Sequence, residues 1–204
     1  MQKNNRRKII ALTGVPGCGK TTLLKMLAGR IGGKIEFINI SDFIKENKNN
    51  PVYKFYVKYD KERDCDVVDV NNLKRAVSSA ISSEYSDKDI IIDGHLSVFF
   101  EATHVVVLRT RPDVLKKRLE KRGYTKEKIK ENLESEVVGL CLYDALERNC
   151  KNIMEIDTTG GIDEDMIVGI IKWINSTGGM NLLDRDRIEK EWIREFYEII
   201  KNAG

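Results

Sequence analysis

The sequence predicts an α/β fold in which helices flank a parallel sheet. Three observations support this prediction. Short apolar runs alternate with segments of helical periodicity along most of the chain. A glycine-rich turn joins the first apolar run to the first helical segment. Polar residues follow each apolar run, at the edge where sheets of this kind hold their ligands.

The first run and its turn lie in residues 8–22, with the sequence KIIALTGVPGCGKTT. Gly14, Gly19, Lys20 and Thr21 occupy the positions of the G-x-x-x-x-G-K-T pattern. Glycines leave backbone N–H groups free to converge on phosphate oxygens, the lysine reaches the β- and γ-phosphates, and the threonine hydroxyl suits Mg²⁺. A chance glycine-rich turn is the alternative, but both flanks have the periodicity that a P-loop requires. The stretch therefore predicts a nucleoside triphosphate site.

Composition limits the class of protein. With 204 residues, 41% hydrophobic and 33% charged, the chain suits one domain and an appendage. The 35 basic and 32 acidic residues give a net charge of +3, without the basic excess of a protein that coats nucleic acid. Four cysteines without a C-x-x-C pair predict neither a zinc site nor a disulfide framework. No apolar run reaches about 18 residues, so we expect a soluble, cytoplasmic protein with reduced thiols.

The remaining elements follow in order. Buried parallel strands are predicted at residues 9–12, 34–38, 89–93, 104–108 and 153–156. Helices are predicted at residues 20–30, 71–85, 112–121, 126–148 and 163–174. Right-handed crossovers would bring the carboxyl ends of the strands to one edge, where ligands bind. Ligand contacts are therefore expected at residues 13–22, 39–42, 93–95, 109–111 and 157–160.

Two segments do not fit this alternation. Residues 45–69 form a weakly periodic insertion rich in lysine and tyrosine, and a loop of this length is usually functional. The S-T-G-G sequence after Asn175 predicts a hinge, and residues 184–202 predict an amphipathic helix. Two interpretations of that helix stay open, namely packing on its own domain and a partner-binding arm.

Asp93 and His95 follow the third apolar run in the sequence D-I-I-I-D-G-H. P-loop enzymes carry a carboxylate at the end of a strand to orient Mg²⁺ directly or through water, and we expect Asp93 to fill this role. The alternative is an aspartate that caps the next turn. His95 either positions water or phosphate, or is a structural histidine with satisfied hydrogen bonds.

Arginines gather between the fourth predicted strand and the helix after it. They are Arg109, Arg111, Arg118 and Arg122. Phosphoryl transfer spreads negative charge over the transferred oxygens, which arginines on a movable cover would stabilise. We expect Arg118, like Lys117, to lie on a solvated helix face. Arg122 precedes Gly123 and Tyr124, which suits the hinge of a lid that excludes water.

Taken together, several motifs point to a known family. The motifs are GVPGCGKTT, DGHLS, VLRTRPDVL, RLEKRGY, ENLESE and IDTTG. In order and spacing they resemble the adenylate kinase isoenzyme 6 family in its archaeal form, also known as the coilin-interacting nuclear ATPase or small-subunit-maturation adenylate kinase. The resemblance covers residues 8–175. It implies a P-loop NTPase fold of the nucleoside monophosphate kinase type, with a five-stranded parallel sheet.

The resemblance also implies an organisation and a site. A kinase domain would span residues 1–175, with a monophosphate-binding insertion at about 39–69, where Ser41 and Asp42 take part, and a lid at about 121–131. Residues 176–204 would form a hinge and an extra C-terminal helix. The residues implied to hold ATP are Gly14, Gly17, Gly19, Lys20, Thr21, Thr22, Arg122 and Asp157, and residues 157–160 would lie beside the adenine. Those implied to hold Mg²⁺ are Thr21 and Asp93, and those implied in catalysis are Lys20, Asp93, His95 and Arg122.

The implied activity is Mg²⁺-dependent transfer from ATP to AMP, giving two ADP, together with ATP hydrolysis. Members of the family assist maturation of the small ribosomal subunit with a ribosomal platform protein and pre-ribosomal RNA. The alternative is an ATP-driven assembly factor whose kinase activity is incidental. A nucleotide-binding module without turnover is disfavoured by Lys20, Thr21 and Asp93. The insertion is longer than is usual in the family, which leaves the acceptor open, and the final helix extends past the family's usual end.

Overall fold

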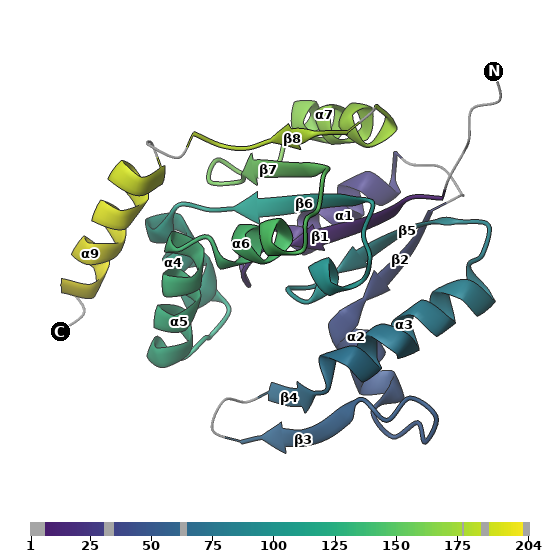
Figure 1. Cartoon of the computed structure of the whole chain (residues 1–204). Helices are drawn as coiled ribbons and strands as arrows, with labels where there is room; N and C mark the ends of the chain where they lie inside the picture. The colour runs from purple at the N-terminus through teal and green to yellow at the C-terminus, as the bar shows by residue number, and fades with distance from the viewer. Residues whose placement is uncertain (1–6, 31–34, 62–64, 177, 185–187, 202–204) are drawn as a thin grey trace.

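Six parallel strands form the central sheet, in the order β2-β5-β1-β6-β7-β8 (Figure 1). The protein is described by a computed structural model, which covers residues 7–30, 35–61, 65–176, 178–184 and 188–201. The strands are β1 (Ile9–Thr13), β2 (Ile35–Asn39), β5 (Asp89–Asp93), β6 (His104–Arg109), β7 (Ile153–Asp157) and β8 (Met180–Asn181). All but β8 coincide with the predicted runs to within one residue, which confirms the parallel α/β sheet.

Strand β8 is a correction to the expected count of five strands. It is two residues long, too short to show a pattern in the sequence, and it pairs in parallel with β7. The Gly179 amide donates to Asn152 Oδ1 at 2.8 Å, and the Ile153 amide donates to Gly179 O at 3.1 Å. The described part of the predicted hinge is thus hydrogen-bonded to the edge of the sheet.

Helices cover both faces of the sheet. They are α1 (Lys20–Ala28), α2 (Ile40–Asn47), α3 (Val70–Glu84), α4 (Pro112–Lys121), α5 (Lys126–Val137), α6 (Leu140–Glu147) and α7 (Glu164–Asn175), with a 3₁₀ turn at Ser97–Phe99. Successive side chains of a strand point to opposite faces. Accordingly Ile10 and Leu12 pack with α1, α4, α5 and α7, whereas Ala11 packs with α6. The strand-to-helix order of the sequence thus produces two apolar layers around one sheet.

The helix predicted at residues 126–148 is two helices, α5 and α6, which corrects the sequence interpretation. They separate at Gly139, whose φ of 68° lies in the left-handed region. The Arg109 guanidinium also lies close there, because a Cβ on Gly139 would stand 3.4 Å from Nη1 of Arg109. Helical periodicity continues through a single glycine, so the break leaves no mark in the apolar pattern.

The insertion is more ordered than its weak periodicity predicted. After α2 it forms an antiparallel hairpin of β3 (Tyr56–Asp60) and β4 (Cys65–Val68), which projects away from the sheet in Figure 1. Phe55 is buried against Phe43 and Tyr53, with ring centroids 6.1 and 6.3 Å away. The hairpin strands are short and none of their residues is buried, so they carry little hydrophobic alternation.

The described part of the C-terminal segment packs against its own domain, which agrees with the first of the two interpretations of the final helix. It contains a π-helical turn at Ile188–Trp192 followed by α9 (Ile193–Lys201), beside α4 and α5 (Figure 1). Ile188 and Trp192 are buried. Residues 185–187 and 202 of the predicted helix lie outside the described residues.

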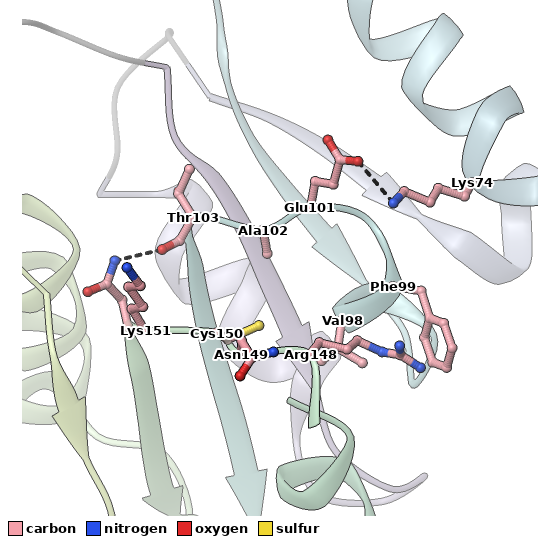
Figure 2. Close-up of a pocket in the computed structure, with 11 residues that line it drawn as sticks. Lys74, Val98, Phe99, Glu101, Ala102, Thr103, Arg148, Asn149, Cys150 and Lys151 are labelled. Atoms are coloured by element: carbon pink, nitrogen blue, oxygen red, sulfur yellow. Dashed lines mark hydrogen bonds and ion pairs between the residues drawn. The ribbon is translucent and has the colours of Figure 1, made fainter. Parts of the chain in front are cut away.

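A cavity of about 490 Å³ lies at the amino-terminal edge of β6 and β7, opposite the P-loop edge (Figure 2). Lys74 pairs with Glu101 at 2.9 Å on its rim, and the Arg148 guanidinium lies 3.4 Å from the centroid of the Phe99 ring. Three of the four charged side chains that line the cavity thus interact with neighbouring side chains. Among the described helices, none is long and apolar enough to cross a membrane.

Candidate functional site

The P-loop connects the end of β1 to the start of α1, as predicted. Gly14 has a φ of 140°, and a Cβ there would stand 2.6 Å from the carbonyl oxygen of Leu108 in β6. Only glycine can bring the loop this close to the neighbouring strand. Lys20, the first residue of α1, donates from Nζ to Gly14 O at 2.6 Å and to Val15 O at 3.1 Å. These bonds hold the ammonium group over the loop.

Two cavities of about 200 Å³ each adjoin the P-loop. The first is lined by Gly14, Pro16, Gly17, Gly19, Lys20, Thr21, Asn39, Ser41, Asp93, Gly94, His95 and Arg122. The second is lined by Gly17, Gly19, Thr22, Arg118, Arg122, Thr158, Gly161 and Ile162. Gly17, Gly19 and Arg122 belong to both. The loop therefore separates two neighbouring spaces that share one arginine.

Asp93 lies at the carboxyl end of β5 and is buried in the first cavity. Its Oδ2 accepts a hydrogen bond of 2.8 Å from Asn39 Nδ2, and its buried Oδ1 has no partner among the described residues. Burial raises the pKa of this carboxyl above its ordinary value, and Lys20 and Asn39 partly oppose the rise. A buried, unpaired carboxylate oxygen beside Thr21 fits a Mg²⁺ ion that is held directly or through water.

His95 lines the first cavity two residues after Asp93. The residue is exposed to solvent. Desolvation by the surrounding chain lowers the pKa of the His95 imidazole, and the Lys20 ammonium lowers it further. The imidazole is therefore neutral near pH 7, and it can donate from one nitrogen and accept at the other. Both interpretations of His95 remain compatible with this position.

Arg122 occupies the predicted place, and Arg118 does not. Helix α4 ends at Lys121, and Arg122 then lines both cavities. The expectation of a solvated Arg118 is wrong, since Nη2 donates to Thr158 O at 2.7 Å and Nη1 lies 3.3 Å from Gly17 O. Residues four apart share one face of a helix, so the spacing of Arg118 and Arg122 carried a signal that could have revealed the pair.

The other two arginines of this group are engaged elsewhere. Arg109 is 1% exposed and pairs with Glu136 and Glu155. Arg111 donates to both carboxylate oxygens of Asp113, at 2.6 and 2.9 Å. Of the four arginines in the predicted group, only Arg118 and Arg122 line a cavity at the P-loop.

The turn after β7 contributes Thr158, which lies within the predicted contact residues 157–160, although Asp157 was the residue singled out there. Asp157 Oδ1 accepts from the Thr159 amide at 2.8 Å and from the Thr159 hydroxyl, and Asp157 lines neither P-loop cavity. Thr158 and Ile162 line the second cavity in its place. Direct contact of Asp157 with a nucleotide stays a prediction. Ile162 lies outside the predicted range, because an apolar side chain in a turn gives no sign of ligand contact in the sequence.

The insertion supplies the far wall of the first cavity. Asn39 ends β2, and its side-chain oxygen accepts from the Asp42 amide at 3.0 Å, which caps the N-terminus of α2. Ser41 lies in the first turn of α2 and lines the same cavity. The predicted contact residues at 39–42 thus lie opposite the P-loop.

Comparisons with known proteins agree with this architecture. Residues 10–139 match a family model described as "AAA domain". "Putative adenylate kinase" of Thermococcus kodakarensis is 39% identical over 81% of this chain and 85% of that protein. The protein of the same name from Methanococcus maripaludis is 32% identical over 95% of this chain and 99% of that protein.

A solved structure extends the comparison to the fold. Shikimate kinase from Acinetobacter baumannii, in complex with shikimate, has a TM-score of 0.53 at 18% identity. The likeness covers 83% of this chain and 94% of that one, and it shows the fold alone. The protein is therefore a parallel α/β protein of the P-loop kinase fold, and it belongs to the family of these archaeal relatives named for adenylate kinase.

Proposed function

We propose that the protein transfers a phosphoryl group from ATP to AMP in the presence of Mg²⁺, giving two ADP. The observation that carries the proposal is the pair of cavities that meet at Gly17, Gly19 and Arg122. A two-substrate kinase needs a donor site and an acceptor site on either side of the transferred group. The names of the archaeal relatives support the choice of nucleotide substrates.

The donor nucleotide lies across the P-loop. Backbone amides of the loop bind its phosphates, and its base side enters the second cavity beside Thr158 and Ile162. Lys20 exchanges its carbonyl partners for phosphate oxygens, which are stronger acceptors for an ammonium group. Arg122 reaches the phosphates from the end of α4.

The acceptor monophosphate enters the first cavity from the side of α2. Asn39, Ser41 and His95 line that wall and offer hydrogen bonds. Its phosphate is already an anion, so no general base is needed, and catalysis depends on alignment and charge. Thr21 and Asp93 would hold Mg²⁺, which neutralises charge on the donor phosphates when bound. Lys20 and Arg122 neutralise the charge that develops on the transferred group.

A coupled assay tests the proposal directly. Purified protein with ATP, Mg²⁺ and AMP should form ADP much faster than the same mixture without AMP. Equal rates with and without AMP would refute the kinase assignment. Replacing AMP by CMP or UMP in the same assay ranks the acceptors, which the insertion leaves open.

ATP hydrolysis coupled to assembly of the small ribosomal subunit is our second candidate. Four exposed apolar side chains at the α5–α6 junction favour a protein partner, and they are Val138, Leu140, Tyr143 and Leu146. The proposed partners are a ribosomal platform protein and pre-ribosomal RNA. Sedimentation of lysate at low salt should place the protein with small-subunit precursors, and its absence from those fractions would count against this role.

A further inference from the structure

A buried ion cluster lies at the end of β6. Arg109 donates from Nε to Glu136 Oε1 at 2.8 Å, from Nη1 to Glu155 Oε1 at 2.5 Å, and from Nη2 to the Glu136 carbonyl at 2.6 Å. The exposed fractions are 1% for Arg109, 2% for Glu136 and 4% for Glu155. Desolvation alone would lower the pKa of Arg109, but the two carboxylates outweigh it and hold the pKa above its ordinary value. The guanidinium is therefore charged and held rigidly.

The C-terminal segment completes this cluster. The Trp192 ring is 1% exposed and lies 5.1 Å from the Arg109 guanidinium carbon. The Leu183 amide donates to Glu155 Oε2 at 3.1 Å. Strand β8 fixes the approach of this segment by pairing with β7. Trp192 and Leu183 thus supply one face and one hydrogen bond of the cluster, and they help to keep water from it.

On its other side the same arginine contacts the donor half of the site. Its carbonyl accepts from the Thr158 amide at 2.7 Å, and the Thr158 hydroxyl lies 2.7 Å from Cys18 O in the P-loop. The next residue, Thr110, lies 2.8 Å from that hydroxyl through its own Oγ1. Arg118 donates to Thr158 O at 2.7 Å. A continuous set of short contacts therefore runs from Trp192 to the P-loop.

We infer that residues 180–184 and 188–192, here called the strap, position the donor-nucleotide loops through Arg109, so that Arg109 and Trp192 are positioning residues for ATP. The inference rests on the proposed ATP site. A shift of Arg109 moves its carbonyl and Thr110, and with them Thr158 and Arg118.

The strap should affect the donor more than the acceptor. Thr158 and Arg118 line only the second cavity, on the donor's base side. Asn39, Ser41 and His95 line only the first cavity, and none of them contacts the cluster in a described hydrogen bond or ion pair. This separation gives the strap a kinetic signature that general loss of stability would not produce.

Steady-state kinetics of two variants of Trp192, with a control variant in α9, provide the first test. Trp192→Ala should raise KM for ATP by about fivefold or more, the lower range of coupling between sites, and leave KM for AMP unchanged. Trp192→Phe should restore most of the ATP affinity, because it keeps a ring over Arg109. The matched control is Tyr197→Ala, which removes an aromatic side chain that is 67% exposed in the same segment and should change neither KM. Equal changes in both KM values, or none, would overturn the strap.

A second measurement avoids disturbing the cluster. The chain has two tryptophans, so Trp173→Phe leaves Trp192 as the sole reporter. Because coupling is reciprocal, binding of ADP or ATP should change the emission of Trp192 and raise the protection of the Leu183 amide against hydrogen exchange. Unchanged emission and protection at saturating nucleotide would contradict the inference.

Calorimetry separates failure of the strap from failure of the proposed function. If the wild-type protein binds no ATP, the proposed function fails. If it binds ATP and Trp192→Ala binds it equally well, only the strap fails.

Discussion

Asn39 and Asp93 face each other at the carboxyl ends of β2 and β5, with 2.8 Å between the amide nitrogen and Oδ2. The pKa of Asp93 is raised by burial, and Asn39 is one of the two groups that oppose the rise. The proposed role of Asp93 in holding Mg²⁺ requires the ionised carboxylate. The activity should therefore fall on acidification, through a pKa that lies above the ordinary value of an aspartate.

Asn39→Ala should move this acidic limb to higher pH. Removing the amide takes away a hydrogen bond to the charged form, so the pKa of Asp93 rises further. The measurement is kcat/KM as a function of pH. Asn47→Ala serves as the control, because Asn47 bonds to Phe43 O within α2 and does not contact Asp93. A limb that stays in place in Asn39→Ala would show that another group titrates.

Arg118→Ala should lower kcat/KM for ATP by roughly tenfold or more. Hydrogen bonds from a charged donor are worth about 1.5–3 kcal/mol each, and Arg118 holds both the Thr158 turn and the P-loop. Lys117→Ala, one position away on an exposed face, should have no such effect. Similar losses in both variants would point to the charge of α4 as a whole.

At the scale of single residues, sequence predicted the groups whose spacing is fixed along the chain. Gly14, Lys20 and Thr21 belong to one motif, and Asp93 ends an apolar strand. Arg118 and Thr158 depend on how α4 and the turn after β7 lie against the P-loop, which is a matter of tertiary packing. The prediction that Arg109 contacts a ligand rested on its position at the end of a strand, where arginines often bind phosphate. The Arg109 side chain is instead buried between two carboxylates.

At the scale of elements, the break between α5 and α6 depends on one backbone conformation. Gly139→Ala should destabilise the protein by about 1–2 kcal/mol, the cost of a left-handed conformation for an L-residue, because φ is 68° there. The matched control is Gly169→Ala in the middle of α7, where a Cβ meets nothing within 4 Å. That variant should stabilise the protein by about 0.5–1 kcal/mol. Urea denaturation measures both, and equal signs would contradict the argument.

The bounds of elements with a strong apolar period were predicted to within one residue, and the bounds of the other elements were not. The central strands and α4 (Pro112–Lys121) fall in the first group. Strand β8 has two residues, and no residue of β3 or β4 is buried, so these strands show no apolar period. These elements are defined by hydrogen bonds to other parts of the chain, which local pattern does not record.

At the scale of the whole molecule, a ligand that binds only the folded state stabilises it. ATP at about 100 times its Kd should raise the free energy of unfolding by about 2.7 kcal/mol. Lys20→Ala should melt close to the wild-type temperature without ATP, since Lys20 is half-buried and bonds only to loop carbonyls and, weakly, to Cys18 Sγ. The melting temperature of Lys20→Ala should rise little when ATP is added, and the variant should transfer no phosphoryl group. Thermal melts with and without ATP test this, and normal turnover in the variant would refute the role of Lys20.

The residues of the ion cluster and the residues that cover it are far apart in the sequence, which matters when the chain is synthesised. Arg109, Glu136 and Glu155 emerge from the ribosome well before Leu183 and Trp192, which cover them. Without Leu183 and Trp192, the Arg109 guanidinium and the two carboxylates would be more exposed to water at the end of β6. A chain that ends before Leu183 therefore contains the P-loop and the three charged residues but lacks the amide and the ring that cover them.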